Sequence, residues 1–444
     1  MIKFFYGAFG VRLAGIAIGF ALHFLLTHIM RPDQYGSYVY LFSWVMLGTI
    51  VARLGFDNYL IKKIPEYLGS QDLYSAQKLI NFSLKIGAAL ALLIGTLYLA
   101  YTLTNDNNQE VFWLLFTASF LLLPILVIAY LNQSVLMALK YFVISNIPIA
   151  IIRPAIMGFV CLLTFFIVKT ELSALFVMQA NAMAFALTAL ILTWLVAHYL
   201  PPAETPSSPP TSDIQKPRIT WLVEASPYTL YAGTSFLNRR IDILLLGMFS
   251  TISSVGIYNV VASLISVVSL ATIVAQQMGK PLIAEAYSNN DLEKMKTSAL
   301  NSGALGFLLT LACSTILMIL GNQILNLFGN IDQSSDAYPA LLILLLGKLL
   351  HSLFGLPGVV LLFTKHQRLS SNLEIITVLA SAGMGVLLIT NYGLVGAALS
   401  TSIILVGRAI TNHHYARKHF DQDFSIINNI PYFYSLLKTK SLRE

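Results

Sequence analysis

The chain has 444 residues, of which 57% are hydrophobic and only 11% are charged, and its formal net charge is +7. Soluble chains carry about 25% charged residues, so this composition excludes an ordinary soluble protein and predicts an all-α, polytopic membrane protein. The two cysteines, Cys161 and Cys313, both lie in apolar runs, which excludes a disulfide framework and a cysteine-rich metal site.

Twelve apolar segments are long enough to span a bilayer, because a spanning helix needs about 20 mostly apolar residues. The first follows Lys3 and lacks a small-residue cleavage site, so we interpret it as a retained span and not as a signal peptide. The shortest break lies between the fourth and fifth segments, where little more than Lys140 separates them. The predicted spans are 4–30, 38–60, 79–101, 111–137, 141–168, 172–198, 221–248, 253–279, 298–321, 337–363, 372–390 and 394–414.

A proline-rich stretch, "PPAETPSSPP" at 201–210, separates the sixth span from the seventh. It has the composition of a solvated linker. The sequence therefore predicts a six-helix bundle at 1–200, a cytoplasmic linker at 201–220, a second six-helix bundle at 221–416 and a basic cytoplasmic tail at 417–444.

The distribution of basic residues in the loops supports twelve spans. Lysine and arginine collect on the cytoplasmic side of membrane proteins. With a cytoplasmic N-terminus, the predicted outer loops hold only Arg31 and Lys169, and every other basic loop residue falls inside. An odd number of spans would destroy this alternation, so both termini are predicted to be cytoplasmic.

The two halves repeat short motifs in the same order. "YGSYVY" at Tyr35 begins the second span and "VGIYNV" at Val255 begins the eighth, and later Asp72-Leu73 corresponds to Asp291-Leu292. Each half holds an even number of spans, so the halves enter the membrane from the same side. The sequence predicts a parallel pseudo-twofold axis along the membrane normal.

Charged residues inside the predicted spans are predominantly basic. A charge at the bilayer centre costs about 2.5 to 3.5 kcal/mol on insertion scales, so each needs a partner, a ligand or a path to the interface. Lys85 and Glu374 also fit an interfacial position. The basic residues are Arg12, Arg53, Lys85, Arg153, Arg239, Arg240, Lys348 and Arg408, against the acids Asp57, Glu224, Asp242 and Glu374.

Several long motifs resemble one family of membrane proteins: "RPDQYGSYVYLFSW" (31–44), "RLGFDNYLIKKIPEY" (53–67), "DILLLGMFSTISSVGIYNV" (242–260), "KPLIAEAY" (280–287) and "NYGLVGAALSTSI" (391–403). Together they are similar to the polysaccharide-transport branch of the multidrug/oligosaccharidyl-lipid/polysaccharide (MOP) exporter superfamily, the Wzx-type flippases. The resemblance implies two six-helix bundles in a V around a central cavity. It also implies alternating-access transfer of undecaprenyl-pyrophosphate-linked oligosaccharide across the bacterial inner membrane, for O-antigen or another surface polysaccharide.

Such a substrate needs cations for its diphosphate, and the planar guanidinium pairs with two phosphate oxygens at once. The substrate-binding candidates are Arg12, Arg53, Arg153, Arg240, Lys348 and Arg408. The resemblance further implies the lipid bilayer, the lipid-linked glycan, and the polysaccharide polymerase and chain-length machinery as partners. No nucleic acid, catalytic residue, metal or cofactor is expected, apart from a coupling H⁺ or Na⁺.

The acidic and titratable residues have alternative roles. Asp57 is either the i,i+4 partner of Arg53 or a coupling-cation site, and Glu224 is either a proton or sodium switch or an interfacial residue. Asp242 is a candidate for cation coupling or for an ion pair within "RRID", and it shares a helical face with Arg239, three residues before it. Alternatively, both arginines and Asp242 satisfy each other or extend to the outer headgroups. Which arginine faces the cavity stays open. His351 is a pH sensor or a packing residue.

Two other functions compete with the flippase. A drug/cation antiporter of the same superfamily needs buried carboxylates, whereas basic residues outnumber acids two to one in these spans. A membrane enzyme of glycan polymerisation needs a large outer loop, whereas the longest predicted one, near 322–336, is short. A lipid II flippase typically has two further helices. The sequence contains no phosphate-binding loop motif, so it gives no support for an ATPase.

Overall fold

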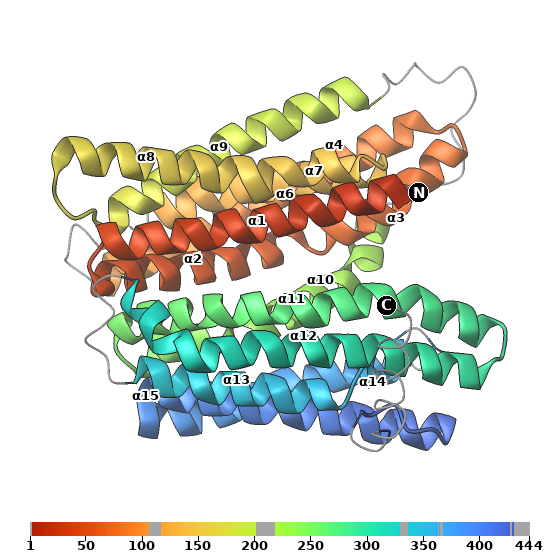
Figure 1. The fold of residues 1–444 in the computed structure, drawn as a ribbon. Coiled ribbons are helices and arrows are strands. Elements are labelled where there is room, and N and C mark those ends of the chain that lie inside the picture. Colours follow the sequence, from red (N-terminus) through yellow and green to blue (C-terminus); the bar gives the residue numbers. More distant parts are fainter. Residues whose placement is uncertain are drawn as a thin grey trace. The chain divides into compact units, whose positions relative to one another are not determined.

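The computed structural model describes residues 2–105, 117–200, 218–328, 336–362, 364, 367–426 and 429. Helices make up nearly all of these residues, and the described part contains no strand (Figure 1). Contacts divide the chain into two compact units, Met1–Phe236 and Leu237–Glu444, which we call unit 1 and unit 2. The division falls within one long helix, α10 (Arg218–Phe249).

Unit 1 is a bundle built from the first half of the chain. It contains α1 (Ile2–Ile29), α2 (Pro32–Arg53), α3 (Phe56–Gly69), α4 (Leu73–Asn105), η1 (Thr117–Leu122), α6 (Leu123–Ala138), α7 (Phe142–Ile147), η2 (Pro148–Ile152), α8 (Arg153–Val168), α9 (Ala174–Tyr199) and the first part of α10. The segments η1 and η2 are π-helical turns. The loop before α9 is tied to α1 and α2, because Leu172 N donates to Ile29 O and Ala174 N donates to Gln34 Oε1.

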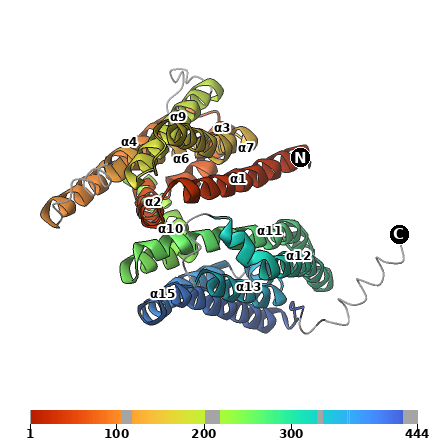
Figure 2. The ribbon, with the colours of Figure 1, turned by 60° about the vertical axis from the view of Figure 1, so that its left-hand side comes forward.

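Unit 2 contains the rest of α10 with α11 (Ile252–Ser288), α12 (Leu292–Asn326), α13 (Ala337–Leu353), α14 (Pro357–Leu362) and α15 (Gln367–Phe420). Figures 1 and 2 show α11, α12, α13 and α15 packed in succession, in agreement with their contacts. α15 is two helices joined at a kink, where Gly393 has φ +52°. This kink separates the two predicted spans 372–390 and 394–414.

Eight helices of the described part are long and apolar enough to cross a membrane, which makes the chain a multi-pass membrane protein. Two further apolar helices, Leu13–Ile29 and Ala337–Leu353, are shorter. Each predicted span overlaps a described helix, and the predicted break between the fourth and fifth spans lies between Ala138 and Phe142. The twelve-span arrangement with cytoplasmic termini stays a prediction.

The predicted second span, 38–60, is interrupted in the structure. α2 ends at Arg53, Leu54 and Gly55 take left-handed backbone angles, and α3 begins at Phe56. A Cβ atom at Gly55 would lie 2.5 Å from the carbonyl oxygen of Ala225 on α10. Glycine is therefore required by its φ of +72° and by the close approach of a distant backbone.

A second interruption occurs in unit 2, within the predicted span 337–363. α13 ends at Leu353, Gly355 has φ +72°, and a Cβ atom there would lie 2.7 Å from Phe424 O. The side chain of Phe424 is fully buried, and Ile426 N donates to Leu353 O. Residues 424–426 of the predicted cytoplasmic tail are therefore buried in unit 2.

α9 shows how these helices are oriented toward lipid. Its small residues, such as Ala180 and Ala184, are buried against neighbouring helices, whereas Leu190 and Trp194 are about two-thirds exposed. Small residues allow helices to approach closely, and large apolar side chains then face hydrocarbon. Ser173 caps the start of this helix by accepting a hydrogen bond from Phe176 N.

Candidate functional site

Arg53 and Asp57 form an ion pair across the break between α2 and α3. The guanidinium nitrogen Nη1 lies 3.0 Å from Asp57 Oδ2, and Arg53 Nε donates to Thr49 O. The same guanidinium stacks over Tyr130, 4.7 Å from the ring centroid. Arg53 is only 8% exposed. Of the two roles expected for Asp57, the structure supports ion pairing with Arg53.

Arg153 lies in a different environment. It is the first residue of α8, directly after the π-helical turn η2 and before the buried Pro154. Its guanidinium carbon lies 4.7 Å from the centroid of Phe185 and 5.8 Å from that of Phe42. Nε is buried without a hydrogen-bond partner, and Arg153 has no acidic partner in the part of the chain that the structure describes. It is a cation enclosed by aromatic rings.

The remaining two candidate residues of unit 1 are Glu224 and Arg12. Glu224 on α10 is exposed and accepts a 2.6 Å hydrogen bond from Tyr59 Oη on α3. This contact links α3 to α10, the helix whose backbone approaches Gly55. Arg12 belongs to α1, and its side chain lies outside the described part of the structure.

In unit 2, Glu374 gathers two side chains from different helices. Arg408 donates through Nη2 to Glu374 Oε1, and Asn238 Nδ2 donates to Glu374 Oε2 over 2.8 Å. Glu374 and Arg408 belong to α15 but lie 34 residues apart, on opposite sides of its kink. Arg408 was expected to bind an anion, but its guanidinium is paired with Glu374. From the sequence, Glu374 also fitted a position at the membrane interface.

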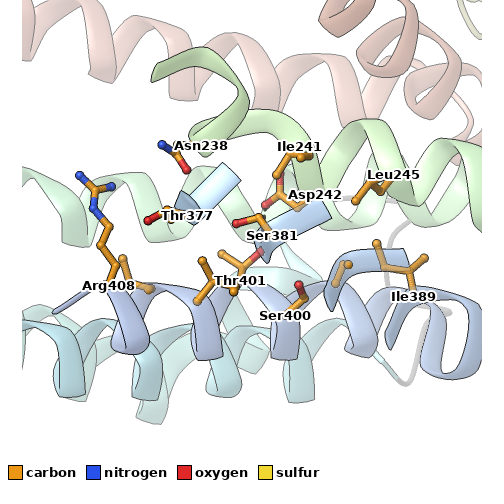
Figure 3. A pocket seen from close by; sticks show the side chains of 14 residues that line it. Asn238, Ile241, Asp242, Leu245, Thr377, Ser381, Ile389, Ser400, Thr401 and Arg408 are labelled. Carbon is orange, nitrogen blue, oxygen red and sulfur yellow. Dashed lines mark hydrogen bonds between the residues drawn. The ribbon is translucent and has the colours of Figure 1, made fainter. Parts of the chain in front are cut away.

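Asp242 lies in a network of hydroxyl groups. Its Oδ2 accepts hydrogen bonds from Tyr258 Oη at 2.7 Å and Thr401 Oγ1 at 3.4 Å, and its Oδ1 accepts from Ile243 N at 2.8 Å. Figure 3 shows Asp242, Ser381 and Thr401 around a common space. This cavity of about 60 Å³ extends from Leu245 and Ile389 to Asn238 and Arg408.

The structure adds a contact to the "RRID" motif. Arg240 acts electrostatically on Asp242. Arg240 Nη1 also donates to Asn259 Oδ1 over 2.9 Å, while Arg239 is exposed. The partly buried Arg240 is therefore oriented by a residue of α11. Residue spacing along α10 alone could not predict this contact.

Lys348 and His351 lie one turn apart on α13. Lys348 is close enough to Arg408 for mutual repulsion, and no acidic partner contacts it among the described residues. His351 lies next to a small cavity that includes Gln276 and Phe307, and its Nδ1 is buried without a hydrogen-bond partner. Lys348 is the counterpart in unit 2 of Arg153 in unit 1, a cation without a carboxylate.

The sequence pattern that defines the family of polysaccharide biosynthesis proteins matches residues 8–286, more than half of the chain. The chain belongs to this family. The match bears out the resemblance to polysaccharide flippases stated from the motifs.

A curated relative and several solved structures add detail. The probable low-salt glycan biosynthesis flippase Agl15 of Haloferax volcanii is 23% identical over 210 residues, which are 46% of this chain and 44% of the relative. The match therefore spans less than half the length of that relative. An inward-facing multidrug resistance MATE family transporter of the MOP superfamily shares the fold, with 17% identity, a TM-score of 0.72 and coverage of 93% of this chain and 98% of the other.

A MOP superfamily transporter from Pyrococcus furiosus, described as having a binding pocket of reverse polarity, is also similar. It is 16% identical, covers 93% of this chain and 95% of its own, and has a TM-score of 0.53. The family and this fold agree with a transporter and not with an enzyme of glycan polymerisation. Groups of histidine, cysteine and carboxylate side chains able to hold a metal are absent from the described part of this family member.

The residues that sequence reasoning missed are the uncharged partners of the buried charges. They are Tyr130 and Thr49 around Arg53, Phe42 and Phe185 around Arg153, and Tyr258 with Asn259 in unit 2. The sequence shows each of these residues as a polar or aromatic side chain inside a predicted span. It could not show which charged residue each one contacts, because every contact except that of Thr49 joins two different helices.

Proposed function

We propose that this family member is a flippase that moves undecaprenyl-pyrophosphate-linked oligosaccharide across the bacterial inner membrane, for O-antigen or another surface polysaccharide. Family membership, the glycan-flippase relative and the MOP fold support this proposal. The observation that carries it is Arg153, a guanidinium with a buried free donor and aromatic walls but no carboxylate among the described residues. A partly buried cation of this kind within a predicted span favours an anionic substrate.

Arg153 has the chemistry to hold a diphosphate. Its planar fork offers parallel donors to two phosphate oxygens, and low dielectric surroundings strengthen the attraction. Phe42 and Phe185 keep the guanidinium in place by cation–π contact, which costs it no donor. Lys348 is the second anion-binding candidate, because it too lacks a carboxylate in the described structure.

The paired cations take a different part in the proposed mechanism. Arg53 and Arg408 are neutralised by Asp57 and Glu374, so we assign them to holding helices together. Arg240 is hydrogen-bonded to Asn259 but retains further donors, and it stays with Arg12 among the substrate-binding candidates. Alternating access of the two units would carry the glycan through a cationic central cavity while the polyprenyl tail remains in lipid.

Asp242 is the proposed coupling residue for H⁺ or Na⁺. It lines a cavity with hydroxyl oxygens, including Thr401, and oxygen ligands are the type that hard cations prefer. A proton- or sodium-gradient requirement that disappears in Asp242→Asn would support this role. Asp57, Glu224 and His351 are less suited, since Asp57 is ion-paired and the other two lie outside this hydroxyl network.

A cation-coupled multidrug antiporter is the alternative, favoured by the fold of the MATE transporters and by the carboxylate of Asp242 in a cavity. Charge argues against it, because Arg153 and Lys348 would repel a cationic drug. Polysaccharide polymerase and chain-length machinery remain proposed partners.

The proposed function is tested in proteoliposomes that hold the purified full-length chain. Fluorescently labelled undecaprenyl-pyrophosphate oligosaccharide is added, and a membrane-impermeant quencher reports how much of it has changed leaflet. We expect the wild type to move the lipid faster than protein-free vesicles. Failure to move it, together with concentrative transport of an organic cation such as ethidium, would overturn the flippase in favour of the antiporter.

A further inference from the structure

A pocket on unit 1 is separate from the candidate site described above. It has a volume of about 340 Å³ and lies along one face of α4. Tyr74, Lys78, Asn81, Phe82 and Lys85 line it, together with Gln77. These positions recur at three- and four-residue steps and so form one stripe along the helix.

The two faces of α4 have opposite character over this stretch. Ala76, Leu79, Ile80 and Ser83 are buried where α4 packs on α2, α3 and α6. In the pocket stripe Tyr74, Asn81 and Lys85 are exposed, whereas Phe82 is partly buried and packs on α3 and α10. This first part of α4 therefore packs an apolar face on the bundle and exposes most of its polar, cationic stripe.

The outward stripe changes chemistry along the helix. Beyond Lys85 its exposed positions are apolar except for Thr96, whose hydroxyl donates to Leu93 O; Leu93 and Leu97 are more than half exposed. An apolar outward stripe is suited to hydrocarbon, whereas a charged one is not. The first part of α4, up to Lys85 and about 18 Å long, is therefore suited to a polar headgroup or water.

Two ammonium groups in the pocket have no carboxylate partner. Lys78 and Lys85 are seven residues apart, which places them about 10 Å apart along one face. Lys78 lies 6.0 Å from the centroid of Tyr74, and neither lysine has an acidic partner among the described residues. The nearby Asp72 accepts a hydrogen bond from Ser75 N at the start of α4.

An aromatic wall completes the pocket. Phe82 lies between Phe56 and Trp221, with ring centroids 5.9 and 5.5 Å away. Trp221 is almost fully buried, so this wall is held in place by α3 and α10. Ammonium groups, an amide and fixed rings together suit a phosphate group attached to a lipid, with an adjoining sugar or isoprenoid segment against the rings.

We propose that this α4 pocket binds the phosphate headgroup of a lipid before the substrate reaches the buried cations. The proposal rests on the proposed function in one respect, since the flippase substrate carries a diphosphate. An isoprenoid diphosphate and an anionic phospholipid share this headgroup chemistry. The pocket is at the end of unit 1 where α4 and α10 begin, which the positive-inside rule assigns to the cytoplasm.

The test is direct binding to the purified full-length chain in neutral detergent, measured by titration calorimetry. The probes are farnesyl diphosphate and dihexanoyl phosphatidylglycerol. We expect Lys78→Gln and Lys85→Gln each to weaken binding about tenfold, since each removes one charge-assisted hydrogen bond. Lys78→Arg with Lys85→Arg should retain binding. Lys62→Gln is the matched control, because Lys62 is exposed on α3 outside the pocket.

Stronger binding of farnesyl diphosphate identifies the isoprenoid carrier as the ligand, and stronger binding of phosphatidylglycerol identifies a phospholipid. Either result supports the proposed pocket if the two Lys→Gln variants weaken that binding. Unchanged affinity in the folded Lys78→Gln/Lys85→Gln variant, or no binding of either probe to wild type, would overturn it. Binding is measured without transport, so the pocket can fail while wild-type flipping succeeds, and flipping can fail while the pocket binds.

Discussion

The two units pair an arginine of a predicted span in different ways. In unit 1, Arg53 pairs with Asp57, four residues later, and the side chains are 10% and 17% exposed. In unit 2, Arg408 pairs with Glu374 across 34 residues, and the side chains are 34% and 29% exposed. The comparison shows that the local pair is the better shielded one, and that the long-range pair holds two halves of a kinked helix together.

Among the candidate substrate-binding residues, each unit has a cation for which the described structure shows no carboxylate partner. Arg153 is surrounded by phenylalanine rings, and Lys348 lies near another cation, Arg408. The charge excess read from the sequence is therefore not spread evenly over all arginines. Arg53 and Arg408 are ion-paired, whereas Arg153, Lys348 and Arg240 are the described candidates that keep donors for an anion.

The largest expected effect tests the breaks that shape the two units. Gly55→Ala and Gly355→Ala should each lower the free energy of unfolding by about 3 kcal/mol, because each adds left-handed strain and a collision with a distant backbone. The thermal midpoint in detergent measures the loss. Gly233→Ala is the control, since nothing lies within 4 Å of its added Cβ atom. Equal midpoints for all three variants would refute the close approaches.

The next effect concerns the shielded pair of unit 1. Asp57→Asn should cost about 3 kcal/mol, because it leaves the guanidinium of Arg53 buried without its counter-ion. Thermal unfolding in detergent again provides the measurement. Adding Arg53→Gln to the same chain should restore much of the loss, and a double variant that is less stable than Asp57→Asn would contradict the pairing.

The more exposed pair of unit 2 should matter less. Glu374→Gln is expected to cost about 1 kcal/mol, because solvent screens a pair that is about a third exposed and Asn238 can still donate to the remaining amide oxygen. The ratio of the two losses sharpens the comparison between the units. A larger loss from Glu374→Gln than from Asp57→Asn would reverse it.

The smallest effect is expected at the helix surface. Lys63 and Glu66 form an i,i+3 pair on α3, with Glu66 about half exposed. Glu66→Gln should change stability by less than about 0.5 kcal/mol, since exposed pairs contribute little. A loss in thermal midpoint as large as that of Asp57→Asn would show that burial does not set the strength of these pairs.

The sequence predicted those features that depend on local pattern. Apolar length located the helices, the Lys140 region separated α6 from α7, and the four-residue spacing offered Arg53 a partner in Asp57. The breaks at Gly55 and Gly355 were missed, because Ala225 and Phe424 create them from far along the chain. The pairing of Arg408 with Glu374 was missed for the same reason.

Other features were present in the pattern but not used. The stripe of polar and aromatic residues on α4, from Tyr74 to Lys85, has helical spacing that could have indicated a binding face. The sequence left the roles of the two arginines of "RRID" open, because the partner of Arg240, Asn259, lies on another helix, α11. Helical spacing within a single span shows which residues share a face. The neighbouring helix determines which partners those residues contact.

The central claim is that unpaired cations bind the anionic substrate and paired cations maintain the fold. We would test it by comparing flipping of labelled undecaprenyl-pyrophosphate oligosaccharide by wild type, Arg153→Gln and the neutral double variant Arg53→Gln/Asp57→Asn, each reconstituted as folded protein. The account predicts that Arg153→Gln loses about tenfold or more in rate, from the loss of a charge-assisted contact, whereas the double variant stays close to wild type. Wild-type flipping by Arg153→Gln together with loss of flipping in the folded double variant would contradict it.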